Sequence, residues 1–142
     1  MVDHDVLRDR MKFFQKMRGL LDGYKGETFE EFTGGHEHYT AAEHELQLAL
    51  QAVLDIARHI VATHSLEKPE EMKKVFFNLA ELGILDKPLA ERLVKAAGAR
   101  NVLVHGYLEV DPKIIYKIIQ NDLPDLDRFA AAIDAYLKKI PA

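Results

Sequence analysis

One segment, residues 100–107 with the sequence R-N-V-L-V-H-G-Y, carries most of the side chains that can do chemistry. A histidine with an ordinary pKa of about 6.5 can donate or accept a proton near neutral pH, which makes His105 a candidate acid or base. The guanidinium of Arg100 stays charged, and its planar fork matches two oxygens of a phosphate. The segment therefore favours proton transfer beside a bound anion.

The spacing of apolar residues predicts that Arg100 lies on the buried face of a helix. It follows Leu93 by seven residues and precedes Val104 by four. A buried guanidinium is costly without a partner, so it requires a carboxylate, a bound anion or a second subunit. Asn101 and His105 are four residues apart and share a neighbouring face of the same helix. Three polar groups are thus expected around one helix end.

The small residues 96–99, A-A-G-A, directly precede this segment. Glycine inside a helix costs about 1 kcal/mol relative to alanine, which close approach of another backbone would justify. One interpretation is a two-fold homodimer with Ala97, Gly98 and Asn101 near the interface. The other is tight packing within the same bundle, with Arg100 paired to an internal acid. The sequence leaves both open.

Two further groups of side chains are candidate sites. Asp55 lies among apolar residues in the middle of a predicted helix, where it is either a partner of Arg100 or His105 or an ordinary surface aspartate. His36, His38 and His44 lie near two glutamates, but no zinc-ligand motif accompanies them. We therefore expect no metal site and no cofactor.

Composition sets the class of protein. The chain has 142 residues, a net charge of −4, 48% hydrophobic residues and no cysteine, so we expect one globular domain over residues 1–142. The acidic balance argues against a general nucleic-acid coat protein, because nonspecific binding of phosphate depends on excess lysine and arginine. Neither a signal peptide nor a membrane span is predicted, which favours a cytoplasmic protein with no membrane partner.

Hydrophobic periodicity predicts an all-α bundle of five or six helices. Capping-box patterns at Thr28 and Thr40 predict a short turn and a long helix, with an irregular stretch over residues 34–39 between them. The expected helices cover residues 4–22, about 40–60, 70–82, 88 to about 106, 112–122 and 124–137. Gly83 is expected just beyond the end of the helix over residues 70–82, and Asp86 should cap the start of the helix that follows at residue 88.

The motif R-N-x-x-x-H-x-Y resembles that of the HepT-like branch of the HEPN superfamily. The resemblance extends to the helix around residues 46–60, the turn Gly83-Ile84-Leu85, and Asp122-Leu123-Pro124. It implies an HEPN-like helical bundle that acts as a homodimeric endoribonuclease toxin and is restrained by a minimal nucleotidyltransferase antitoxin. The catalytic pair would be Arg100 and His105.

The same resemblance implies that the antitoxin adds AMP to Tyr107, while Asn101 and Asp55 are supporting candidates. RNA cleavage without metal needs a base, an acid and positive charge on the phosphate, which these residue types supply. Five residues along a regular helix separate two side chains by roughly 140° and about 7.5 Å. One chain's Arg100 and His105 are therefore not expected to converge, and a two-fold dimer would supply a second pair. The alternative function is a catalytically silent nucleotide-binding or adaptor bundle that docks a nucleotidyltransferase.

Overall fold

The computed structural model describes residues 3–64, 72–104 and 110–140, and in these ranges it contains seven α-helices, one 3-10 turn and no strand. The elements are α1 (His4–Leu21), η1 (Asp22–Tyr24), α2 (Phe29–Phe32), α3 (His36–His64), α4 (Met72–Glu81), α5 (Lys87–Val104), α6 (Pro112–Asn121) and α7 (Leu123–Lys139). The all-α prediction is confirmed. The expected number of helices, five or six, was too low because the turn after Thr28 is itself a short α-helix, α2.

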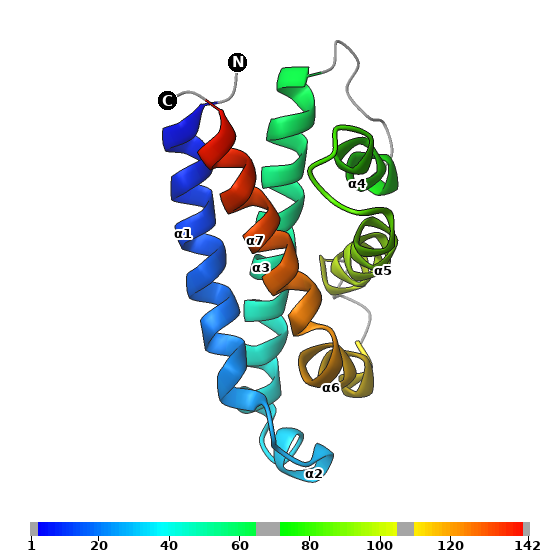
Figure 1. The fold of residues 1–142 in the computed structure, drawn as a ribbon. Coiled ribbons are helices and arrows are strands. Elements are labelled where there is room, and N and C mark those ends of the chain that lie inside the picture. Colours follow the sequence, from blue (N-terminus) through cyan, green and yellow to red (C-terminus); the bar gives the residue numbers. More distant parts are fainter. Residues whose placement is uncertain (1–2, 65–71, 105–109, 141–142) are drawn as a thin grey trace.

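The long helix α3 is the centre of the bundle. It contacts α1, α4, α5 and α6. Figure 1 shows α1 on one side of α3, α4 and α5 on the other, and α7 crossing in front of α3. The short helices α2 and α6 lie toward the end where α1 finishes and α3 begins. This order places α3 between α1 and α5, which is the arrangement that builds the candidate site.

Most predicted helix ends are confirmed. Thr28 forms the expected capping box with Glu31, and the side chains of Asp86 and Asp111 accept hydrogen bonds from backbone amides at the starts of α5 and α6. Gly83 has a φ of 77°, a conformation that favours glycine, and it ends α4 as expected. The predicted start of α4 near residue 70 and the predicted end of α5 at Gly106 lie outside the described residues.

The start of α3 was predicted wrongly. The helix begins at His36, so Thr40 is an interior residue, and most of the stretch expected to be irregular is helical. The side chain of His38 explains the extra turn, because its Nε2 lies 2.8 Å from a carboxylate oxygen of Glu27 and its ring packs edge-on against Tyr24. These tertiary contacts outweigh the local capping signal at Thr40.

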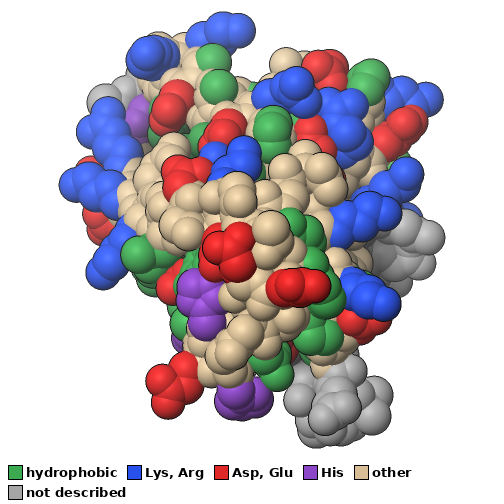
Figure 2. Space-filling model, turned by 90° about the horizontal axis from the view of Figure 1, so that it is seen from below, with side chains coloured by type: hydrophobic (Ala, Val, Ile, Leu, Met, Phe, Trp, Pro, Cys, Tyr) green, Lys and Arg blue, Asp and Glu red, His purple; other side chains and the backbone are tan. Residues whose placement is uncertain are grey.

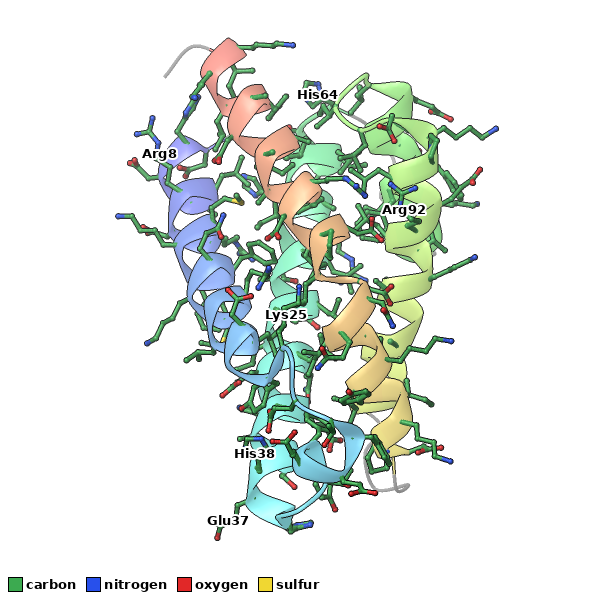
Figure 3. The ribbon with its side chains drawn as sticks, turned by 60° about the horizontal axis from the view of Figure 1, so that its bottom comes forward. Arg8, Lys25, Glu37, His38, His64 and Arg92 are labelled. Carbon is green, nitrogen blue, oxygen red and sulfur yellow. The ribbon has the colours of Figure 1, made fainter. Side chains whose placement is uncertain are left out.

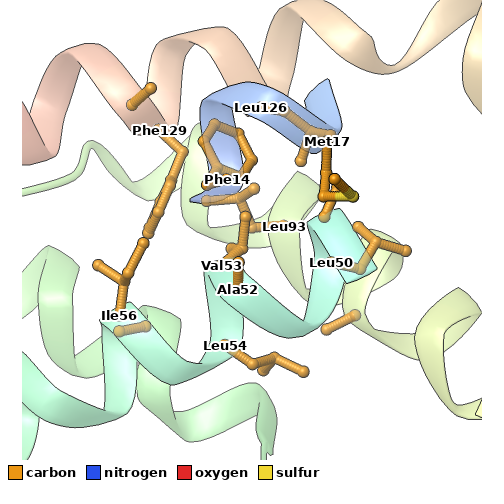
Figure 4. Close-up of a cluster of buried hydrophobic side chains, with 14 of the residues drawn as sticks. Phe14, Met17, Leu50, Ala52, Val53, Leu54, Ile56, Leu93, Leu126 and Phe129 are labelled. Carbon is orange, nitrogen blue, oxygen red and sulfur yellow. The ribbon is translucent and has the colours of Figure 1, made fainter. Parts of the chain in front are cut away.

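The helices are held together by one continuous cluster of buried apolar side chains. Figure 4 shows Phe14 of α1, Val53 of α3 and Phe129 of α7 meeting in its centre. Arg18 of α1 lies at the edge of this core, where its Nε is 2.8 Å from Asp127 and its Nη1 is 2.7 Å from Asp22. The two carboxylates pair with the guanidinium of Arg18, a residue that is only 9% exposed, and the contact with Asp127 ties α1 to α7.

Candidate active site around Arg100

Arg100 projects from α5 toward α3. On the same helix Leu93 and Ala97 are 1% and 4% exposed, and Arg100 itself is partly buried, as its spacing predicted. Its Nε donates a hydrogen bond to Oε1 of Gln51 on α3, over a distance of 2.6 Å. The sequence predicted a carboxylate, an anion or a second subunit as partner. The structure shows that one of its contacts is a neutral amide from the central helix.

Gln51 connects Arg100 to Asp55. Its Nε2 donates to Oδ1 of Asp55 over 2.8 Å, and Oδ2 of Asp55 lies 3.6 Å from Nη1 of Arg10 on α1. The structure therefore brings Asp55 to Arg100 through an intervening amide. Because the Gln51 amide accepts from one side and donates to the other, the two neighbours fix its orientation. The network holds Arg100 through Nε and crosses from α5 through α3 to α1.

A pocket of about 410 Å³ lies between α1 and α3 beside this network. Gln51, which accepts the hydrogen bond from the Nε atom of Arg100, is one of the residues that line the pocket. The residues that line the pocket are Val6, Asp9, Arg10, Phe13, Leu48, Gln51, Ala52 and Asp55. Its volume is within the range of small-molecule binding sites.

Three of the predicted site residues cannot be placed by their side chains. His105 and Tyr107 lie outside the described residues, and Asn101 belongs to α5 but only its backbone is described. The structure therefore joins Arg100 and Asp55 into one network, while the pairing of Arg100 with His105 stays a prediction.

Gly98 is exposed on α5, and a Cβ atom added to it would meet nothing within 4 Å. Tight packing within this chain therefore does not account for the glycine, which contradicts the intramolecular interpretation at this position. Ala97, in contrast, is buried in the chain's own core at 4% exposure, so its side chain is not part of an outer surface. The outward-facing member of the small-residue run is Gly98.

The histidines near α2 take part in local contacts. Besides the contact between His38 and Glu27, the Nδ1 of His36 lies 3.0 Å from the hydroxyl of Tyr39. Figure 3 shows His38 and Glu37 at the α2 end of the bundle. In the part of the chain that the structure describes, no three histidine, aspartate or glutamate side chains are grouped to hold a metal ion.

The charged side chains are mixed on the face seen from the α2 end. Figure 2 shows lysine and arginine around its rim with acidic side chains between them, so the cations described there do not form one continuous basic patch. Among the described helices, none is long and apolar enough to cross a bilayer. A polyanion that binds this face would therefore contact individual lysine or arginine side chains and not a continuous basic surface.

Comparison with known proteins identifies the family of this all-helical bundle. Residues 10–133 match the family model described as ribonuclease HepT-like. The chain therefore belongs to the HepT-like ribonuclease family, as its motif predicted.

Two relatives are named as nucleases. The mRNA nuclease HepT of Shewanella oneidensis is 34% identical over 90 residues, which cover 63% of this chain and 68% of the relative. The tRNA nuclease HepT of Aphanizomenon flos-aquae is 26% identical over 132 residues, which cover 93% of this chain and 90% of the relative. The two names give different classes of RNA.

The fold is also similar to solved structures of toxin and antitoxin complexes. One is the tri-AMPylated Shewanella oneidensis HEPN toxin in complex with its MNT antitoxin, with a TM-score of 0.82, 26% identity, and coverage of 94% of this chain and 99% of that chain. YutE, a cytosolic protein of Bacillus subtilis, has the same fold with a TM-score of 0.84 and 20% identity.

Proposed function

We propose that this chain is a metal-independent endoribonuclease, the toxin of a toxin and antitoxin pair. The observation that supports this most directly is the anchored position of Arg100, held at Nε by Gln51 beside a pocket large enough for part of a nucleotide. Its membership of the HepT-like ribonuclease family and the relatives named as nucleases support the same conclusion.

In the proposed reaction, Arg100 binds the phosphate whose bond is cleaved, and His105 takes part in proton transfer. A base removes the proton of the 2′-hydroxyl, whose oxygen attacks phosphorus while the bond from phosphorus to the 5′-oxygen breaks. An acid protonates that leaving oxygen. The charge of Arg100 stabilises the additional negative charge on the phosphate oxygens. The products are a 2′,3′-cyclic phosphate, which can open to a 3′-phosphate, and a free 5′-hydroxyl.

The proposed function is tested by incubating the purified, unmodified protein with single-stranded RNA in EDTA. We expect cleavage, with 2′,3′-cyclic phosphate or 3′-phosphate ends identified by mass spectrometry. Cleavage that requires added Mg²⁺ would contradict the metal-independent mechanism. Binding of nucleotide or RNA without any cleavage would instead favour the nucleotide-binding or adaptor function.

We also propose that the active form is a two-fold homodimer with Gly98 near its interface. Such a dimer would place two copies of Arg100 and His105 around one cleft. Arg100 of one chain could then act with His105 of the other, although the two residues of a single chain are separated along the helix. The exposed Gly98 allows close approach of a second helix.

Substitution Gly98→Leu should weaken association by at least tenfold, because a leucine side chain would occupy the space of the approaching helix. The fold should be kept, since a Cβ at this position meets nothing within the chain and leucine favours helix over glycine. Sedimentation over a range of concentrations measures the association, and circular dichroism confirms the fold. A wild-type protein that is monomeric at micromolar concentration, or a variant that associates as tightly as wild type, would contradict the dimer.

The proposed partner is a minimal nucleotidyltransferase that adds AMP to Tyr107. Support comes from the motif, in which the tyrosine follows His105 by two residues, and from the similar fold of a tri-AMPylated toxin bound to its MNT antitoxin.

A further inference from the structure

The pocket between α1 and α3 has an apolar wall and a polar rim. Val6 and Leu48 contribute less exposed apolar side chains, whereas the exposed Asp9, Arg10 and Phe13 and the partly exposed Asp55 form the rim. This combination suits a flat, largely apolar group with hydrogen-bonding atoms at its edge. A nucleobase has that chemistry, because both its faces can stack while its edge carries donors and acceptors.

Phe13 is a large aromatic side chain that the fold of this chain leaves exposed to solvent in the pocket. It is 43% exposed, although most phenylalanines of the chain are buried in the core. An aromatic ring at the mouth of a polar-rimmed pocket is the platform on which single-stranded RNA-binding proteins stack an unpaired base.

The position of the pocket relative to Arg100 connects it to the proposed reaction. Gln51 lines the pocket and accepts the hydrogen bond from Arg100 Nε at 2.6 Å. In a nucleotide, only the sugar separates the base from its phosphate. Gln51 thus belongs both to the pocket and to the network that holds Arg100, which is what a base next to an Arg100-bound phosphate would require.

We propose that this pocket is a subsite for one unstacked base of the RNA substrate, adjacent to the phosphate bound at Arg100. The assignment rests on the proposed ribonuclease function and adds to it a site of base recognition.

The rim also indicates which bases fit. Ionised carboxylates only accept hydrogen bonds, so Asp9 and Asp55 favour bases that present an amino group. Adenine, cytosine and guanine have an exocyclic amino group and uracil has none. The Asp55 side chain is 35% exposed, which leaves its carboxylate accessible from the pocket. The subsite should therefore discriminate against uracil.

A second copy of the chain fits this pocket less well than a base does. Half of its eight lining residues are charged or amide side chains, whereas charged residues are depleted from the core of protein interfaces. A concave pocket with both signs of charge at its rim favours a small inserted group.

The test compares Phe13→Ala with Leu20→Ala. Both residues are exposed on α1, at 43% and 46%, but Leu20 does not line the pocket. Binding is measured by fluorescence anisotropy with short 2′-O-methyl oligonucleotides of A, C and U, which the proposed reaction cannot cleave. We expect Phe13→Ala to bind oligo-A and oligo-C about tenfold more weakly, since stacking contributes on that scale, and Leu20→Ala to match wild type.

Base choice provides a second readout. Wild type should bind oligo-U most weakly and should cleave least at uracil. Because the amide of Asp9→Asn also donates hydrogen bonds, this variant should show a smaller difference in affinity between oligo-U and the other oligonucleotides.

Equal binding and equal cleavage patterns for Phe13→Ala and Leu20→Ala, in a protein that cleaves RNA, would overturn the subsite but leave the ribonuclease function intact. Phe13→Ala could instead dissociate the protein into monomers while each chain binds RNA with unchanged affinity. In that case the pocket is an interface between two copies of the chain, and the base subsite is wrong. A wild-type protein that does not cleave RNA overturns the proposed function itself.

Discussion

Substitution His105→Ala or Arg100→Ala is expected to remove nearly all ribonuclease activity while the fold is kept. Loss of a general acid or base lowers a rate by about 10²- to 10⁴-fold, and loss of a charge that stabilises the transition state lowers it by about 10²- to 10³-fold. The Arg100 effect should appear in kcat/KM, because the guanidinium binds the phosphate in both the substrate and the transition state. Single-turnover cleavage of a labelled RNA in EDTA measures both effects.

Arg92 provides the matched control on the same helix. It is an arginine of α5 whose Nε lies 2.8 Å from Asp125, and its side chain is 43% exposed. Arg92→Ala removes one positive charge from α5 but leaves the network of Gln51 unchanged, so it should retain cleavage within about twofold of wild type. If Arg92→Ala loses as much activity as Arg100→Ala, overall charge rather than a specific phosphate contact accounts for the effect. Full activity of His105→Ala would overturn the mechanism.

A smaller loss is expected for Gln51→Leu, as a consequence of the same mechanism. The substitution removes the acceptor for Arg100 Nε but keeps the charge, so the guanidinium stays in the site with a less fixed orientation. A hydrogen bond to a charged group is worth roughly 1.5 kcal/mol, which corresponds to about a tenfold lower rate. The loss should fall on kcat more than on KM and should be smaller than that of Arg100→Ala.

Periodicity and capping signals predicted most of the fold because they report local chemistry. The helix near residues 4–22, the capping box at Thr28 and the glycine turn at Gly83 all follow from interactions between residues close in sequence. The start of α3 was missed because contacts of His38 with Glu27 and neighbouring rings come from other elements. Local patterns do not contain that information.

The candidate site was predicted in part for the same reason. The sequence indicates Arg100 and Asp55 as charged residues among apolar neighbours, but it does not indicate Gln51, because a neutral amide on a helix gives no such signal. Its spacing of four residues before Asp55 places both side chains on one face of α3, which was the available clue. The role of Phe13 and the pocket depends on how α1 packs on α3, which one helix pattern cannot show.

The second large effect is expected at Tyr107, where addition of AMP should abolish cleavage without unfolding the protein. Each AMP group carries a phosphate, and a phosphate attached two residues after His105 can compete for the positive charge of Arg100. The adenosine would also occupy space that the RNA requires. The inhibition is therefore local competition, and the modified protein should keep its helical content and thermal midpoint within a few degrees of the unmodified protein.

The experiment is co-expression with a cognate minimal nucleotidyltransferase, followed by intact mass measurement and a cleavage assay. Wild type should gain one or more AMP units, and its rate of RNA cleavage should fall by at least 100-fold. Tyr107→Phe should gain no AMP and should still cleave RNA. Tyr116→Phe is the matched control, because that tyrosine donates a hydrogen bond of 2.6 Å to the backbone oxygen of Glu27 and lies on α6. This variant should be modified and inhibited like wild type. Equal mass gain by wild type and Tyr107→Phe would place the modification elsewhere, and a modified wild type that still cleaves RNA at full rate would show that AMP addition at Tyr107 does not control the toxin.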